Sequence, residues 1–151
     1  MGNKVNVIQL ATATALLVFS ANSSLAANFE VKMLNKSDAG AMVFEPALIR
    51  VAPGDTVTFV PTDKGHNAES IKGIAPEGGE LFKGGIGKEV VASFTVPGIY
   101  GVKCTPHFGM GMVALIVVAD DLSNLDAAKA AQAPPKAIER LEPLFAAIEA
   151  Q

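Results

Sequence analysis

The chain has 151 residues, of which 50% are hydrophobic and 18% are charged, and its formal net charge is −3. This is the length of one ordinary domain with its own core, and the apolar fraction is too high for a disordered chain. The negative balance excludes a basic nucleic-acid binder, because such a protein must neutralise phosphate charge. Cys104 is the single cysteine, so an internal disulfide is also excluded.

The first 26 residues have the layout of a secretory signal peptide. Lys4 gives a positive start, Val5–Phe19 is uncharged and mostly apolar, and Ser24-Leu25-Ala26 supplies small residues before a cleavage point. A membrane anchor is the alternative, but this stretch is shorter than the ~20 apolar residues that a spanning helix needs. The sequence therefore predicts a signal peptide over residues 1–26, cleaved near Ala26, and one mature domain over residues 27–151 outside the membrane.

Residues 28–119 have the pattern of short β-strands. Apolar and charged residues alternate over Phe29–Met33, which is the period-two pattern of a half-buried strand. Val113–Val118 is apolar throughout, as expected for a strand that is covered on both faces. Further short segments, separated by turns rich in glycine and proline, are Ala41–Phe44, Leu48–Val51, Thr56–Val60, Val90–Val96, Ile99–Lys103 and Met112–Val118. This pattern predicts an all-β protein, either a sandwich or a barrel.

The composition changes after Ala119 and predicts two C-terminal α-helices that begin at about residue 123. Ser123 followed by Asp126 is a helix-start pattern, and an alanine-rich segment continues to Ala133. A second helix should open at Pro134-Pro135, and its apolar residues recur on one face at Ile138, Leu141, Phe145 and Ile148. Pro143 removes a backbone donor inside this pattern, so we expect a kink or a split there. Both helices should cover the sandwich.

The residues that carry chemistry are concentrated between the last two predicted strands. Cys104 lies at the end of one strand, Met112 at the start of the next, and His107 between them. Each residue spans at most ~3.6 Å, so all three side chains can reach one ion from a short loop. The only other histidine, His66, also follows a strand. Because a sandwich brings loops at the same end together, we expect His66 to lie beside Cys104 and His107.

Two imidazoles, one thiolate and one thioether discriminate between metals. Structural zinc sites use cysteine and histidine without methionine, whereas two histidines and a cysteine with a weak axial methionine form a blue copper site for electron transfer. Four protein donors leave no position for a substrate, which favours a carrier over an enzyme. Met110 and Met112 are both candidates for the axial donor. Met112 is favoured, because it opens a strand, whereas Met110 lies between two glycines.

The motif Cys104-x-x-His107-x-x-x-x-Met112, with Gly65-His66-Asn67 upstream, resembles that of the cupredoxins of the plastocyanin and pseudoazurin type. The likeness to pseudoazurins includes the two C-terminal helices, which plastocyanins lack. It extends over nearly the whole mature chain, through Phe29–Lys36, Gly40–Ala47, Val51–Phe59, Pro61–Asn67 and Tyr100–His107. The resemblance implies a cupredoxin-like Greek-key β-sandwich with one type I blue copper ion, whose ligands are His66, Cys104, His107 and Met112.

The same resemblance implies a periplasmic one-electron carrier that cycles between Cu(I) and Cu(II). Its implied partners are a copper nitrite reductase or a related denitrification enzyme as acceptor and a cytochrome-type donor, both met by transient docking of a monomer. Lysines near the expected copper end could form a basic ring that steers an acidic partner, namely Lys36, Lys64, Lys83 and Lys103. The alternative is that these lysines are only solvated surface residues.

Two rival functions fit part of the pattern. A copper storage or delivery protein uses similar ligands, but it would bind Cu(I) labilely and have no intensely blue Cu(II) state. A reductase needs a second metal or an open coordination position, and both histidines are already assigned. An enzyme is therefore not expected, and an absorption spectrum with Cu(II) separates the carrier from the storage protein.

Overall fold

The computed structural model of the protein describes residues 1–2 and 25–150, so nearly all of the predicted signal peptide lies outside the described residues. Ala27 is tied into the fold, because its N–H donates to Asp55 Oδ1 (2.8 Å) and its carbonyl accepts from the Thr56 N–H (2.9 Å). Within the described part of the chain, no helix is both long enough and apolar enough to cross a membrane.

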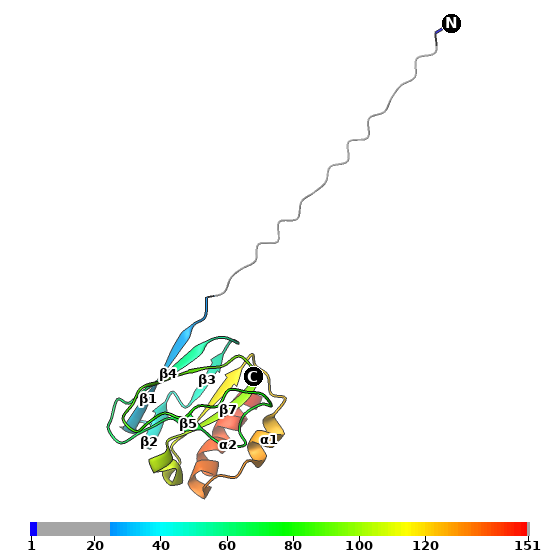
Figure 1. The fold of residues 1–151 in the computed structure, drawn as a ribbon. Helices are drawn as coiled ribbons and strands as arrows, with labels where there is room; N and C mark the ends of the chain where they lie inside the picture. The colour runs from blue at the N-terminus through cyan, green and yellow to red at the C-terminus, as the bar shows by residue number, and fades with distance from the viewer. Residues whose placement is uncertain (3–24, 151) are drawn as a thin grey trace.

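The strands form two four-stranded sheets (Figure 1). The first sheet has the order β2-β1-β4-β6 and consists of β1 (Asn28–Ser37), β2 (Gly40–Glu45), β4 (Thr56–Val60) and β6 (Val90–Ser93). The second has the order β3-β8-β7-β5 and consists of β3 (Leu48–Val51), β5 (Glu69–Ser70), β7 (Gly98–Lys103) and β8 (Val113–Val118). The pairs β1–β4 and β3–β8 are parallel, and the other pairs are antiparallel. The chain thus crosses repeatedly between the two sheets.

The predicted strands are all present, with three differences. β1 continues to Ser37 beyond the predicted Met33. β5 was not predicted, because two residues are too short to show a periodic pattern. β6 ends at Ser93 rather than Val96, since the next two N–H groups bond elsewhere. The Phe94 N–H donates to the Asp55 carbonyl (3.3 Å), and the Thr95 N–H donates to Glu80 Oε1 (2.9 Å).

The space between the sheets is filled by a core that is rich in aromatic rings. Phe59 packs against Phe44 edge to face and stacks on Phe82, with ring centroids 5.9 Å and 5.4 Å apart. Phe94 contacts both Phe82 and Tyr100 in edge-to-face geometry. Such pairs stabilise a core beyond the burial of their area. Cys104 and Met112 belong to the same buried cluster, so one end of this core reaches the region that carries the histidines.

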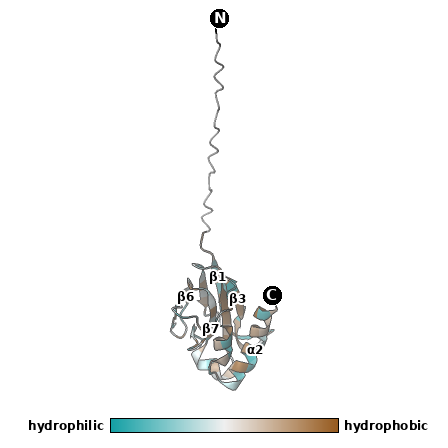
Figure 2. Cartoon of the chain, turned by 90° about the vertical axis from the view of Figure 1, so that its right-hand side faces the viewer, coloured by the Kyte–Doolittle hydropathy of each residue, from teal (hydrophilic) through white to brown (hydrophobic). Residues whose placement is uncertain are grey.

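β8 is the central element of the fold, because it is buried on both faces as its sequence predicts. All six of its residues are buried. One face belongs to the core between the sheets, and the other belongs to a second core with the helices α1 (Leu125–Ala130) and α2 (Pro135–Glu149). Seen from the side, α2 lies against the outside of the sheet that contains β3 and β7 (Figure 2). The two helices therefore form a third layer.

The helix boundaries differ from the sequence prediction. Asn124, not Ser123, precedes α1, and its side chain does not cap the helix but accepts from the Ile99 N–H (2.8 Å) and donates to the Ile99 carbonyl (2.9 Å). This tie to β7 replaces the expected cap. The helix ends at Ala130 rather than Ala133.

Of the two outcomes expected at Pro143, a kink or a split of the second helix, the split is wrong. α2 runs without interruption through Pro143 from Pro135 to Glu149. Four buried side chains on both sides of the proline hold the helix against its neighbours, namely Ala137, Leu141, Phe145 and Ile148. Each large apolar side chain stabilises by about 1.5–3 kcal/mol when buried, which together offsets the loss of one backbone hydrogen bond.

The double burial of β8 gives a direct stability prediction. Leu115 lies in the helix-side core and is 0% exposed, so Leu115→Ala should lower the free energy of unfolding by about 2–5 kcal/mol. Urea unfolding of the copper-free protein measures this loss. The matched control is Leu81→Ala, at a leucine that is 66% exposed, which should stay within about 0.5 kcal/mol of wild type. Equal effects of the two substitutions would contradict the assignment of this core.

Glu69 on β5 is held as a carboxylate at the edge of the second sheet. Its Oε1 lies 3.2 Å from Lys103 Nζ on the neighbouring strand. Burial by itself raises the pKa of Glu69, but hydrogen bonds from Thr105 and Lys103 and the charges of Lys103 and Lys83 together lower it below its ordinary value of 4.5. The folded protein therefore favours the ionised form.

This lowered pKa predicts a pH dependence that Glu69→Gln should reduce. The carboxylate contributes stability above the unfolded pKa, and that contribution is lost as the pH falls through the lower folded pKa. Glu69→Gln should therefore be less stable than wild type at pH 7, and the difference should shrink below the ordinary pKa of 4.5. Urea unfolding of the copper-free protein across this range measures it, with the exposed Glu45→Gln as control. A difference that is constant with pH would refute the assignment.

Candidate metal centre

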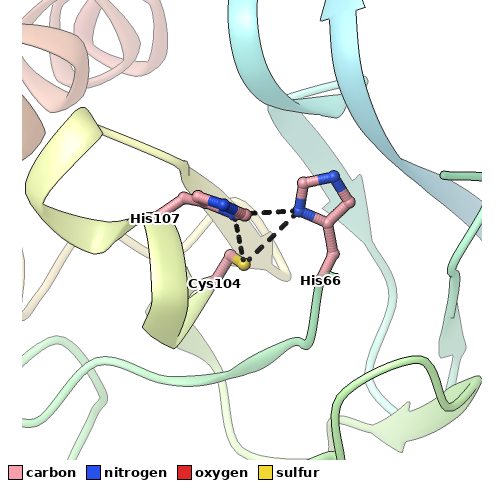
Figure 3. Close-up of side chains that lie close together, drawn as sticks. All are labelled: His66, Cys104 and His107. Carbon is pink, nitrogen blue, oxygen red and sulfur yellow. Dashed lines mark hydrogen bonds between the residues drawn. The ribbon is translucent and has the colours of Figure 1, made fainter. Parts of the chain in front are cut away.

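Three donor side chains meet at one end of the sandwich (Figure 3). His66 Nδ1 lies 3.1 Å from His107 Nδ1 and 3.7 Å from Cys104 Sγ. Cys104 Sγ and His107 Nδ1 are 3.5 Å apart. His66 comes from the loop after β4, Cys104 follows β7, and His107 lies in η1, a 3-10 helix over Thr105–Met110. The structure therefore brings together three side chains from two distant segments, as the sequence predicts.

The short loop expected between Cys104 and Met112 contains the helix η1 and is closed by backbone hydrogen bonds. The Cys104 N–H donates to the Met112 carbonyl (3.0 Å), and the Met112 N–H donates to the His107 carbonyl (3.1 Å). The His107 N–H in turn donates to the Cys104 carbonyl (3.1 Å). Gly111 ends η1 with a φ of 85°, a left-handed conformation that glycine adopts without strain. The backbone thus joins Cys104, His107 and Met112 directly.

The two candidate methionines differ sharply in exposure. Met112 is 0% exposed and belongs to the core cluster that contains Cys104. Met110 is 47% exposed. The methionine at the start of the strand is therefore the one that lies on the buried side with the sulfur of Cys104.

Asn35 on β1 determines which nitrogen of His66 is free. Its Oδ1 lies 2.8 Å from His66 Nε2. A carbonyl oxygen only accepts, so Nε2 carries the proton and Nδ1 keeps a lone pair that faces Cys104 and His107. Burial, followed by the charge of His107, lowers the pKa of His66 by more than Asp63 raises it, which favours the neutral ring. Sequence reasoning missed Asn35, because no local pattern links β1 to His66.

Asn67 ties the two donor-bearing segments to each other. Its Oδ1 accepts from the Thr105 N–H (2.7 Å), and its Nδ2 donates to the Gly84 carbonyl (3.1 Å) and to Glu69 Oε2 (3.3 Å). The residue is only 3% exposed. The sequence motif contains Asn67, but its spacing to Thr105 and Gly84 gives no sign of these contacts.

The donor set fits a soft, thiophilic metal ion. With metal–nitrogen bonds of about 2.0 Å and metal–sulfur bonds of about 2.3 Å, three donors in one plane lie roughly 3.5–3.7 Å apart, close to the observed separations. Burial raises the pKa of the Cys104 thiol, so a thiolate there needs a positive partner. Imidazole and sulfur donors select copper or zinc rather than the oxygen-binding Ca²⁺ and Mg²⁺. Because His66 and Cys104 are 0% exposed, the centre is closed to solvent on their side.

Comparisons with known proteins agree with this donor set. Residues 31–119, more than half of the chain, match the copper binding proteins of the plastocyanin/azurin family. The pseudoazurin of Paracoccus pantotrophus is 58% identical over 133 residues, which cover 88% of this chain and 92% of that protein. The pseudoazurin of Methylorubrum extorquens is 50% identical over 141 residues, covering 93% and 95% of the two chains.

Solved structures give the same result. The crystal structure of pseudoazurin from Methylobacterium extorquens AM1 matches with a TM-score of 0.77 and 54% identity, covering 80% of this chain and 98% of that one. Native pseudoazurin from Hyphomicrobium denitrificans matches with a TM-score of 0.75 and 49% identity, covering 80% and 97%. The predicted cupredoxin-like Greek-key sandwich with two C-terminal helices is confirmed. The chain belongs to the pseudoazurins, cupredoxins that use copper as their cofactor and that carry electrons rather than catalyse a reaction.

Proposed function

We propose that this protein is a periplasmic one-electron carrier in which His66, Cys104, His107 and Met112 hold one copper ion. The observation that carries this proposal is the convergence of the donor atoms of His66, Cys104 and His107 within 4.8 Å of one another. Met112 completes the set, because its backbone is hydrogen-bonded to both Cys104 and His107 and its side chain is buried with Cys104. When bound, copper supplies a Cu(I)/Cu(II) couple.

The chain's own contribution is a donor cage that does not need to rearrange. The imidazoles suit Cu(II), and the thiolate and thioether suit Cu(I), so one set of side chains accommodates both oxidation states. The hydrogen bond to Asn35 fixes the orientation of the His66 ring, and the Cys104–Met112 segment is closed by its own hydrogen bonds. Burial of His66, Cys104 and Met112 excludes water and leaves no room for a substrate. These properties support electron transfer.

His107 is the proposed port for electrons. It is the one partly exposed residue of the four, since the other three are 0% exposed. Pro106 beside it is exposed, and Met110 in the same short helix is 47% exposed. An apolar rim around a ligand edge permits close contact with a partner without the removal of bound water from charged groups.

Three exposed lysines support docking with an acidic partner. Lys64 lies two residues before His66, and Lys36 follows Asn35. The backbone of Lys83 forms a β-bridge with Glu69 of β5. Lys103 is not a free charge, because it forms an ion pair with Glu69 and its Nζ lies 5.0 Å from the Phe108 ring centroid. We propose a copper nitrite reductase or a related denitrification enzyme as the acceptor, a cytochrome-type donor, and transient docking by a monomer.

Export to the periplasm is supported by the start of the folded domain. Leu25 is 90% exposed and Ala26 is exposed, whereas Ala27 hydrogen-bonds to Asp55 and Thr56. Cleavage after Ala26 would therefore leave these hydrogen bonds in place. We propose that residues 1–26 are the signal peptide and that the mature single domain covers residues 27–151.

Copper storage or delivery is the alternative function. A storage site must release its ion, whereas here three of the four donors come from one hydrogen-bonded segment and the fourth, His66, from a segment that Asn67 ties to it. The closed arrangement favours the carrier.

The thiolate assignment predicts a spectroscopic result. The protein loaded with Cu(II) should have an intense visible band from charge transfer between the thiolate and copper. Cys104→Ser should abolish this band, because Cys104 is the only cysteine. Circular dichroism shows whether the fold is kept, and Met110→Leu, at the exposed methionine, is the control that should keep the band. A wild-type protein that folds, binds Cu(II) and has no such band would support storage instead.

The axial assignment predicts a change in reduction potential. Met112→Leu leaves three donors. Cu(I) accepts three ligands readily, whereas the more highly charged Cu(II) loses more when the fourth donor is removed, and this loss of a ligand outweighs the preference of a thioether for Cu(I). The potential measured by voltammetry should therefore rise. Met110→Leu, the same substitution two residues away, should leave the potential unchanged. A raised potential in Met110→Leu together with an unchanged potential in Met112→Leu would assign the axial position to Met110.

The lysine assignment predicts a change in rate. Lys64→Glu should slow electron transfer to an acidic partner several-fold at low ionic strength, with an unchanged visible spectrum, because such charges act mainly on association. The effect should vanish near 1 M salt, where charges are screened beyond about 3 Å. Stopped-flow kinetics measure both rates. Lys72→Glu, the same charge change at an exposed lysine beyond β5, is the control. Equal slowing by both variants would show a net-charge effect instead.

A further inference from the structure

The side chain of Arg140 on α2 connects three parts of the molecule. Its Nη1 donates to the carbonyls of Met42 (2.8 Å) and Gly111 (3.3 Å), and its Nη2 donates to the carbonyl of Ala41 (2.8 Å). Ala41 and Met42 belong to β2, and Gly111 directly precedes Met112. One guanidinium therefore joins the helical layer, the first sheet and the segment that carries His107 and Met112.

Gly111 shows how tightly this segment lies on the helix. A Cβ at this position would lie 2.7 Å from the Lys136 carbonyl oxygen and 2.9 Å from Arg140 Cδ, so no side chain fits. The Gly111 N–H donates to the Phe108 carbonyl (3.0 Å), which closes η1. The turn between Met110 and Met112 is therefore enclosed by the helix on one side and its own hydrogen bonds on the other.

Met42 is the second position that Arg140 holds. It has a φ of 52°, an uncommon conformation for a residue other than glycine, and it packs against the core cluster that contains Cys104 and Met112. A residue in this conformation persists only where its surroundings hold it. The hydrogen bond from Arg140 to its carbonyl is such a constraint.

We propose that Arg140 is a positioning residue for the copper centre, acting through the backbone of Gly111 and Met42 on the place of Met112 and His107. Only arginine fits this role, because a planar fork donates in several fixed directions, whereas lysine donates from a single point. The layer formed by α1 and α2 thereby restrains the segment that carries His107 and Met112, in addition to covering the core. The proposal rests on the ligand assignment made above for His107 and Met112.

Hydrogen exchange in the copper-free protein tests the first half of the proposal. Arg140→Ala should speed exchange of the Met112 and Gly111 amides about tenfold or more, because a charge-assisted hydrogen bond that restrains their segment is lost. Arg140→Lys keeps the charge without the fork, so it should show a smaller acceleration at the same amides. No change at these amides would overturn the proposal, whatever the spectrum of the copper-loaded protein.

The copper-loaded protein tests the second half. Arg140→Ala should shift the reduction potential and change the relative intensities of the visible absorption bands, and Arg140→Lys should shift both in the same direction by less. The matched control is Arg50→Ala, because Arg50 also anchors α2, through the Ile148 carbonyl (3.3 Å), and ties it to the turn after β8 through an ion pair with Asp120. It should lower thermal stability and leave potential and spectrum unchanged.

The outcomes separate this proposal from the proposed function. If Arg140→Ala and Arg50→Ala lower stability alike and neither alters the potential, Arg140 is only a helix anchor and the proposal is wrong. If wild type itself has no thiolate-to-copper band, the ligand assignment fails first, and the exchange result still shows whether Arg140 restrains the segment.

Discussion

A single buried amide, the side chain of Asn67, is the constraint on which the metal end of this protein depends. It joins the segment after β4, the segment after β7 and the loop at Gly84, because each of its polar atoms bonds to a different part of the chain. Without it, the buried Gly84 carbonyl would lose its partner at about 1–3 kcal/mol, and the partly buried Thr105 N–H would lose its acceptor. Its neighbour His66 is placed by the same contacts that place Cys104.

The layered architecture explains why this end is rigid. β8 has one face in the core between the sheets and the other in the core under the helices. Met112 immediately precedes this strand, and Cys104 immediately follows β7, the neighbour of β8. The segment that connects them is therefore anchored at both ends to the two best-packed strands. A redox site gains from such anchoring, because the donors keep their places when the charge of the ion changes.

Charge is distributed in a way that the net value of −3 conceals. Glu69 pairs with Lys103 at the edge of the second sheet and leaves the exposed Lys36, Lys64 and Lys83 as the free positive groups of the proposed ring. The ion pair fixes β5 against β7, whereas the exposed lysines act at a distance on an approaching partner. The Glu69–Lys103 pair thus serves the fold, Lys36 and Lys64 serve the proposed docking, and Lys83 takes part in both, because its charge also lowers the pKa of Glu69.

The sequence by itself determined seven of the eight strands, the two α-helices, the double burial of β8 and the set of candidate donors. These follow from residue types and short periodicities, which depend on neighbours in the chain. Only the tertiary structure decided that Asn35 orients His66, that Asn67 and Arg140 restrain the loop, that Lys103 is paired, and that α2 continues through Pro143. Each of these depends on contacts between residues far apart in sequence, where burial and hydrogen-bond satisfaction outweigh local preference, and no local pattern records them.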